Sequence, residues 1–324
     1  METKTAPKRL KRILVGLAKL AAAAIVLYAA GRQIAEAWSS IDSRSVELSP
    51  LYFVISGILY LAGLAFFGGF WRAAASDMGG KMGHIEALRA YYVSQLGKYI
   101  PGKAWLPVIR CALVDRDQTP VSVTALSSVY ETVAMMGIGA LLAVVTLIAG
   151  GLRRTDIILA SAGLSACLSG LVIPFVFTRL VRVIGVPLRK KGNELARPIR
   201  YGTLVKALYM QTAGWILLGL SLAAAAAGIG QHQWSAAGIL LAIGSCALAV
   251  SGGFVAIVVP AGIGVREWIL IQTLSPVMGP GVAALTAVAM RLIQVVTELA
   301  ISGILYWSYH GRMDNDKRHH PNLQ

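Results

Sequence analysis

Long runs of apolar residues dominate the chain, and polar residues are confined to short stretches between them. A helix needs about 20 mostly apolar residues to cross the roughly 30 Å hydrocarbon core of a bilayer. Five runs meet this length, and two more meet it if Lys19, or Arg291 with Glu298, is accepted inside the helix. We predict spans at 13–34, 50–70, 133–150 (extended back to about 120), 157–178, 204–228, 235–259 and 282–308.

The composition excludes the main alternatives to a membrane protein. Hydrophobic residues make up 56% of the 324 residues and charged residues 14%, whereas a typical soluble domain has about 25% charged residues. Too few polar residues remain to cover a soluble globule. We therefore predict an all-α, polytopic transmembrane helix bundle of seven or eight spans. Its single transmembrane domain would occupy 13–308, between a basic cytoplasmic N-terminus (1–12) and a polar cytoplasmic tail (309–324).

The charge distribution predicts the topology. The chain has 30 Lys and Arg against 15 Asp and Glu, a formal net charge of +15. In a soluble protein this excess would indicate nucleic acid, but in a membrane protein it marks cytoplasmic loops. The basic N-terminus and the basic stretches 72–89 and 179–206 then share the cytoplasmic side, so 84–113 should not cross completely. A cytoplasmic tail requires 260–278 to complete a crossing as a short helix.

Two segments, about 84–114 and 251–274, interrupt the apolar pattern with Pro, Gly and basic residues. Irregular backbone at membrane depth is tolerated only where it is buried in protein or lines a watery cavity, and half-helix N-termini favour anions. We predict two broken or re-entrant segments that bind an anionic headgroup; the alternative is interfacial loops with snorkelling cations. The candidate substrate-binding residues are Lys98, Pro101, Gly102, Lys103 and Arg110 in the first segment and Pro260, Gly262, Gly264, Arg266 and Glu267 in the second.

Three ionisable residues, Glu131, Arg291 and Glu298, lie within otherwise apolar spans. Such residues cost about 2.5–3.5 kcal/mol on insertion scales, so they should face the protein interior and be paired. Arg291 and Glu298 are two turns apart on one helix face, too far to pair directly. We add all three to the substrate-binding candidates; an internal ion-pair clamp is the alternative. The stretches 127–142 and 294–307 also resemble each other with one gap, through duplication or by chance.

Catalytic, cofactor and metal signatures are not found in the sequence. The stretch 97–104 approaches a P-loop, but Ala104 replaces the hydroxyl that would hold Mg²⁺. The three cysteines and five histidines show no ligand spacing. Asp115 and Asp117 are explained as capping residues. We therefore expect no catalytic residue, no cofactor and no metal, and a protein that is not an enzyme.

The motifs Tyr-Ile-Pro-Gly-Lys-Ala-Trp (99–105), followed by Arg110, and Val-Pro-Ala-Gly-Ile-Gly-Val-Arg-Glu (259–267) resemble the lysylphosphatidylglycerol synthase/flippase transmembrane family. The resemblance covers roughly 10–310. It implies a helical bundle that binds or moves aminoacylated phospholipids or lipid-linked sugars. Bifunctional members also carry a large soluble domain that transfers an aminoacyl group from tRNA. That domain does not follow the last span here, so we do not expect aminoacyl transfer.

The leading functional hypothesis is a bacterial inner-membrane lipid translocase for a phospholipid or a polyprenyl-phosphate sugar. The alternatives are a non-catalytic membrane subunit of envelope polysaccharide or lipid assembly and a lipid-modifying membrane transferase. Homo-oligomers and envelope-synthesis partners are left open, and no nucleic-acid partner is expected. The assigned roles are phosphate binding by Arg266, Arg110 and Lys103, and charge balance or proton transfer by Glu267, Glu131 and Glu298.

Overall fold

The computed structural model describes residues 48–99, 105–183, 189–190, 193–194, 199–230, 234–255, 262 and 264–319. For 189–190, 193–194, 306 and 308–319 it describes the backbone alone. The predicted first span (13–34) and the basic N-terminus lie outside the described residues. So do four predicted site residues: Pro101, Gly102, Lys103 and Pro260.

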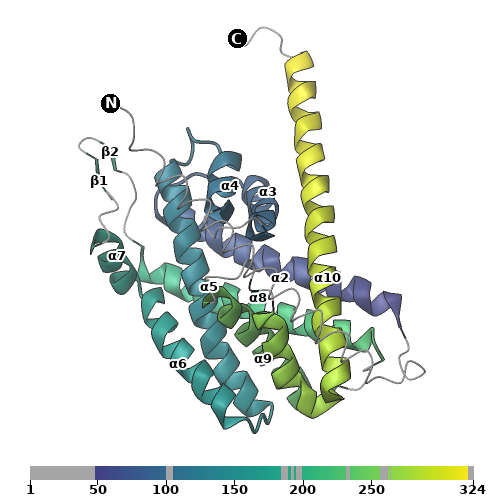
Figure 1. Ribbon diagram of the computed structural model, residues 1–324. Coiled ribbons are helices and arrows are strands. Elements are labelled where there is room, and N and C mark those ends of the chain that lie inside the picture. Colours follow the sequence, from purple (N-terminus) through teal and green to yellow (C-terminus); the bar gives the residue numbers. More distant parts are fainter. Residues whose placement is uncertain are drawn as a thin grey trace, which may run out of the picture.

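The described part of the chain is a bundle of helices (Figure 1), as predicted. Six of its helices are long and apolar enough to cross a membrane: α2, α5, α6, α8, α9 and α10 as far as Leu305. They correspond to six of the seven predicted spans. In chain order the elements are α2 (Pro50–Asp77), α3 (His84–Gln95), η2 (Leu96–Tyr99), α4 (Trp105–Leu113), α5 (Val121–Ala149), α6 (Thr155–Val172), α7 (Pro174–Val183), β1 (Arg189–Lys190), β2 (Asn193–Glu194), α8 (Tyr201–Ala227), α9 (Ala236–Val255) and α10 (Val265–His319).

Helices α2 and α8 run antiparallel along their length and define the two ends of the bundle. At one end, the backbone N–H of Arg200 and the hydroxyl of Thr203 donate to the Asp77 carboxylate, at 2.8 and 2.6 Å. At the other, the Ser49 N–H donates to the Gly228 carbonyl at 2.9 Å. We call these the Asp77 end and the Gly150 end, because α5 starts at the first and terminates beside Gly150 at the second.

Helix α6 stops before the predicted end of its span at residue 178. Ile173 has extended backbone (φ −64°, ψ 122°), as expected for a residue that precedes a proline. Pro174 then starts the separate helix α7, since its ring fits the first turn of a helix. Both α6 and α7 pack along α5. The Tyr130 hydroxyl of α5 donates to the Val172 carbonyl at 2.9 Å, and the Tyr130 ring packs on Phe177.

The first interrupted segment is a hairpin that enters and leaves the bundle at the Asp77 end. At its base the Lys81 N–H donates to the Gln118 carbonyl at 3.1 Å, and the Asp115 N–H donates to the Glu86 carboxylate at 2.8 Å. Its helices α3 and α4 have 12 and 9 residues, so they extend only about 18 and 14 Å. This first hairpin (84–113) therefore does not cross, as the charge pattern predicts.

Helix α10 consists of two segments that fold back on each other at Gly279. This residue has non-helical backbone (φ 77°, ψ 157°) between Pro276 and Pro280. Arg266 and Arg291 would lie about 37 Å apart in a straight helix, yet both line one small cavity. The first segment of α10 (265–278) therefore runs antiparallel to the second segment (280–319).

Helix α9 and the first segment of α10 form a second hairpin (236–278), which opens from the Gly150 end. At the start of α9, a Cβ added to Gly150 would lie 3.0 Å from the Ala237 carbonyl oxygen. Near the other end of α9, Ser251 donates to the carbonyl of Met136, in the middle of α5, at 3.4 Å. The first segment of α10 then returns, so that Gln272 accepts a hydrogen bond from Arg154 at 2.9 Å.

The tip of the second hairpin changes the predicted path of the chain but not the end of the bundle toward which the last helix runs. Helix α9 ends and the segment 265–278 begins in the middle of the bundle, so neither completes the crossing predicted for 235–259 or for 260–278. The chain still returns to the Gly150 end at Gly279. From there the second segment of α10 crosses toward the Asp77 end, where Ser302 donates to the Tyr92 carbonyl at 3.3 Å. In Figure 1 this segment (yellow) continues beyond the rest of the bundle.

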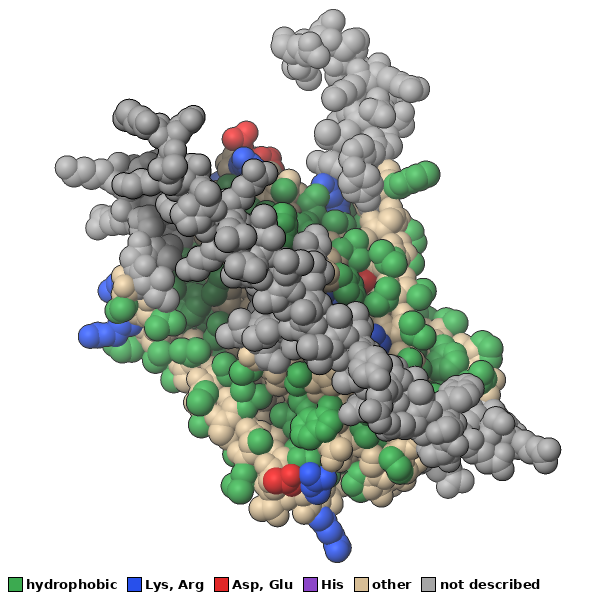
Figure 2. Space-filling view, viewed as in Figure 1, with side chains coloured by type: hydrophobic (Ala, Val, Ile, Leu, Met, Phe, Trp, Pro, Cys, Tyr) green, Lys and Arg blue, Asp and Glu red, His purple; other side chains and the backbone are tan. Residues whose placement is uncertain are grey.

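The outer surface agrees with a membrane environment. Figure 2 shows hydrophobic side chains spread over the coloured part of the visible face, whereas most charged side chains lie toward its edges. Large apolar side chains stay exposed on α5, α6 and α10, for example Val145, Leu159 and Val296 at 57, 67 and 62%. A soluble monomer rarely exposes so large an apolar surface.

We expect Gly214→Ala to destabilise the fold, because α2 and α8 are in contact through this glycine. An added Cβ would overlap the ring of Phe67, which is itself buried. Overpacking of this kind costs about 1–3 kcal/mol. The midpoint of thermal loss of folded, detergent-solubilised protein should therefore fall. The control Gly163→Ala places its methyl in open space on α6 and should leave the midpoint unchanged or raise it slightly. Equal midpoints for both variants would contradict the close packing of α2 and α8.

Candidate functional site

The two hairpin tips meet inside the bundle at a group of charged and phenolic side chains. We call this group the central cluster: Tyr60, Lys98, Tyr99, Arg266, Arg291 and Glu298. Tyr60 lies on α2, Lys98 and Tyr99 on η2 at the tip of the first hairpin, and Arg266 at the tip of the second. Arg291 and Glu298 come from the second segment of α10.

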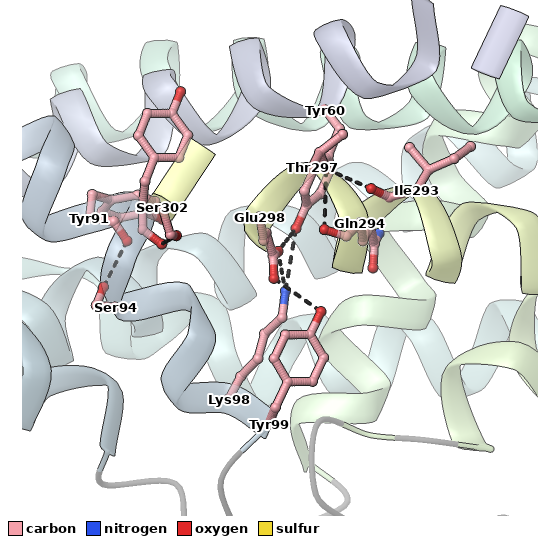
Figure 3. Close-up of polar contacts among 11 residues, drawn as sticks. Tyr60, Tyr91, Ser94, Lys98, Tyr99, Ile293, Gln294, Thr297, Glu298 and Ser302 are labelled. Atoms are coloured by element: carbon pink, nitrogen blue, oxygen red, sulfur yellow. Dashed lines mark hydrogen bonds and ion pairs between the residues drawn. The ribbon is translucent and has the colours of Figure 1, made fainter. Parts of the chain in front are cut away.

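Glu298 is the hydrogen-bond acceptor at the centre of the cluster, and its side chain is fully buried. Its carboxylate forms an ion pair with Lys98 and accepts hydrogen bonds from Tyr60 and, at 3.0 Å, from Tyr99. The Lys98 ammonium also donates to the Tyr60 hydroxyl at 3.3 Å. Figure 3 shows these side chains converging from three elements. A buried carboxylate is tolerable only with such partners, so Glu298 ties the first hairpin to α2 and α10.

Arg266 and Arg291 add positive charge to the cluster. The Arg291 guanidinium lies 5.6 Å and the Lys98 ammonium 5.2 Å from the centre of the Tyr99 ring. Within the described residues, Arg266 Nε and Arg291 Nη1 and Nη2 are buried and have no hydrogen-bond partner. Both arginines line a cavity of about 20 Å³, together with Gln294 and Glu267. That space holds about one water molecule.

Glu267 stabilises the start of α10 instead of pairing with a cation in the described structure. Its carboxylate accepts a hydrogen bond from the backbone N–H of Gly264, which precedes the helix. This is the glutamate half of a capping box, in which an acid three residues into a helix accepts the N-cap N–H. Gly264 has φ +83°, a conformation that favours glycine.

Gly262, another predicted site residue, allows the second hairpin to close tightly. It has φ +66°, and an added Cβ would lie 2.8 Å from the backbone of Gly253 in α9. A Cβ on Gly253 would in turn lie 2.6 Å from Arg266 Cγ. These glycines bring the Arg266 side chain against the end of α9. The glycines of the motif therefore serve the backbone, and Arg266 is the residue that they position.

Arg110 and Glu131 form a separate ion pair, which we call the buried clamp. Both side chains are almost fully buried, with Nη1 and Oε2 3.0 Å apart. Tyr91 donates to Glu131 at 3.0 Å, and Arg110 Nε donates to Ser94 at 3.1 Å. The Arg110 guanidinium also stacks 4.3 and 4.8 Å from the ring centres of Tyr91 and Trp71. This geometry joins the first hairpin to α5 and leaves the guanidinium enclosed by protein.

An apolar groove opens beside the central cluster, between α2 and the second segment of α10. It encloses about 540 Å³. Leu61 and Thr297 in its wall directly follow and precede the cluster residues Tyr60 and Glu298. The Lys98 side chain keeps 16% of its surface exposed. The lining residues are Phe53, Val54, Gly57, Ile58, Leu61, Ala289, Leu292, Ile293, Val296 and Thr297.

The structure thus brings four predicted site residues, Lys98, Arg266, Arg291 and Glu298, into one cluster and separates the buried clamp from it. Sequence reasoning missed Tyr60 and Tyr99, which donate to Glu298. Tyr99 directly follows Lys98, a predicted site residue, and this adjacency was the available signal. Tyr60 lies in an apolar run with no local signal. Within the described ranges, no three His, Cys, Asp or Glu residues lie close enough together to hold a metal ion.

We expect the buried clamp to behave as a structural pair. Glu131→Leu alone leaves a buried arginine without its partner, which typically costs about 3–5 kcal/mol. The thermal midpoint should therefore fall sharply, and Arg110→Leu/Glu131→Leu should recover part of the loss. Asp156→Asn is the control, because the Arg154–Asp156 pair is exposed and such pairs contribute little. A double variant no more stable than the worse single variant would contradict a pairwise clamp.

No curated protein matches the chain. A family model described as the lysylphosphatidylglycerol synthase TM region matches residues 13–302. That range contains both hairpins, the buried clamp and the central cluster. The chain therefore belongs to the lysylphosphatidylglycerol synthase transmembrane-region family.

Proposed function

We propose that this membrane protein is a lipid translocase, which carries the polar headgroup of an anionic lipid between the two leaflets. The observation that carries the proposal is the meeting of two hairpins, entered from opposite ends of the bundle, at the central cluster. Headgroups that approach from either leaflet would reach the same set of charges. The family supports a lipid-related membrane function.

Crossing the bilayer is energetically costly for the charged headgroup of a lipid but not for its acyl chains. Taking an ion from water into a low-dielectric interior costs of order 20 kcal/mol in the idealised limit, whereas acyl chains are already in an apolar medium. The central cluster offers Lys98, Arg266 and Arg291 as partners for a phosphate. The groove of about 540 Å³ between α2 and α10 lies beside it and is apolar enough for a lipid tail. The two features together suit one amphiphilic molecule.

The hairpins also suggest how access would alternate. Each hairpin opens toward one end of the bundle, and broken segments near the midplane are typical of transporters with inverted halves. The Lys98–Glu298 contact holds the tip of the first hairpin against α10. A phosphate that competes with Glu298 for Lys98 would release this tip. Movement of either hairpin would then expose the cluster to the corresponding leaflet.

We place the protein in the bacterial inner membrane, with the Asp77 end and the N-terminus in the cytoplasm. Arg153 and Arg154 lie at the Gly150 end, against many more basic residues toward the other end. Cytoplasmic loops carry such an excess. The proposal includes no enzymatic step, cofactor or metal. The basic residues in the loops and helix ends near Asp77 are Arg72, Lys81, Arg89, Arg116, Arg179, Arg182, Arg200 and Lys206.

The test is lipid movement in liposomes that contain the purified protein. We expect fluorescent phosphatidylglycerol in the outer leaflet to become inaccessible to dithionite faster than in protein-free vesicles. The assay uses both tail-labelled and head-labelled lipid, so that an effect of the label position is excluded. Glu298→Gln should slow this movement at least tenfold, because it removes the charge that organises Lys98, Tyr60 and Tyr99. Vesicles with wild-type protein that are no faster than empty vesicles would refute the proposal.

The control for this experiment is Asp156→Asn, which removes an exposed acid at the Gly150 end and should leave the rate unchanged. Tyr99→Phe supplies a milder change at the cluster, because it deletes one hydrogen bond to Glu298 and keeps every charge. It should give an intermediate rate. Equal rates for all three variants and the wild type would remove the central cluster from the mechanism.

A further inference from the structure

The charge balance of the central cluster restricts the headgroup that it accepts. Its three cations, Lys98, Arg266 and Arg291, face two carboxylates, those of Glu298 and the adjoining Glu267. Within the described residues, therefore, the site has one positive charge in excess. Excess charge in a buried site is costly unless a counter-ion supplies the balance.

Neither carboxylate is free to receive a cationic ligand. Glu298 already binds Lys98 and accepts hydrogen bonds from two tyrosines. Glu267 accepts the Gly264 N–H at the start of α10, so its withdrawal would uncap the helix. Donors, in contrast, are in surplus, because Arg266 Nε and two nitrogens of Arg291 lack a partner among the described residues.

The two arginines that carry these donors line one small space. Arg266, from the tip of the second hairpin, and Arg291, from the second segment of α10, line the same cavity of about 20 Å³. The cavity has room for about one water-sized atom group, which matches a single phosphate oxygen better than a complete headgroup. The rest of the phosphate would lie toward Tyr99, whose ring is flanked by Arg291 and Lys98.

We infer that the site selects a lipid with a net negative headgroup, whose phosphate is held by Arg266 and Arg291, and that it disfavours a lysyl headgroup. This inference rests on the proposed function and names its substrate class. A lysyl ester adds two ammonium groups to the phosphate, so the headgroup has a net positive charge. Those ammonium groups would meet three cations and no free carboxylate among the described residues. The substrate class would thus differ from the lipid that gives the family its name.

The test measures binding to the intact purified protein in detergent, by native mass spectrometry of lipid adducts. Phosphatidylglycerol should bind at least tenfold more tightly than lysylphosphatidylglycerol, and diacylglycerol, which has no phosphate, should not compete. Glycerol 3-phosphate should compete only at far higher concentration, since it has no tails. Equal or tighter binding of the lysyl lipid would overturn the inference. Competition by glycerol 3-phosphate at the concentration of the lipid would reassign the ligand to a free phosphate ester.

Two variants test the named residues. Each arginine would donate hydrogen bonds to the charged phosphate, and such bonds contribute strongly to the binding free energy. We therefore expect Arg266→Gln and Arg291→Gln each to weaken phosphatidylglycerol binding about tenfold or more. Arg154→Gln is the matched control, because this arginine is exposed at the Gly150 end. This variant should bind phosphatidylglycerol as tightly as the wild type. Affinities equal to the control in both cluster variants would exclude the arginine pair. The comparison of lipids on wild-type protein needs no variant, so it decides the inference even if a variant fails to fold.

This binding experiment is independent of lipid movement. Selective binding of phosphatidylglycerol without transport in liposomes would refute the translocase and leave the headgroup assignment in place. Transport without preference between the anionic and lysyl lipids would support the translocase and refute the headgroup assignment.

Discussion

Glu298 has no exposed side-chain surface, and the arrangement around it follows from the need to solvate its charge without water. An ionised carboxylate in an apolar interior must be paired and hydrogen-bonded. Lys98 and Tyr99 can meet this need only if the first hairpin ends in the middle of the bundle. Tyr60 can meet it only if α2 crosses α10 at the same level. One buried charge therefore fixes the depth of the first hairpin and the relative position of two long helices.

The backbone supports this polar centre at positions where side chains are absent. Gly262 lies against the backbone of Gly253, and Gly253 leaves room for Arg266, so the second hairpin closes within reach of Arg291. Gly279 allows α10 to reverse direction between two prolines. A larger residue at Gly262 would meet the Gly253 backbone, and one at Gly253 would meet the Arg266 side chain, so either would displace this arginine. The interior packing and the placement of charge are thus parts of the same arrangement.

The sequence predicted the helices well, because span length and hydropathy depend on local composition. It also predicted that 84–113 does not cross, because the positive residues on both sides require an even number of crossings. It could not predict which charges pair. Arg110 and Lys98 lie in the same interrupted segment, yet one is enclosed with Glu131 and the other reaches Glu298, 200 positions away. Such partners depend on tertiary contacts, and Tyr60 is a further example, since nothing near it in the chain marks it as a donor to a carboxylate.

The two halves of the described chain have related designs with opposite directions. A hairpin that opens at the Asp77 end precedes α5, which contains Glu131, and a hairpin that opens at the Gly150 end precedes the second segment of α10, which contains Glu298. The weak similarity of 127–142 to 294–307 places these two glutamates in corresponding positions. The halves differ in how far the acid is neutralised. Glu131 and Arg110 enclose each other, whereas the cations near Glu298 outnumber the acids near it among the described residues. The first site is thus a closed ion pair that joins a hairpin to α5, whereas the second keeps arginine nitrogens without a hydrogen-bond partner among the described residues.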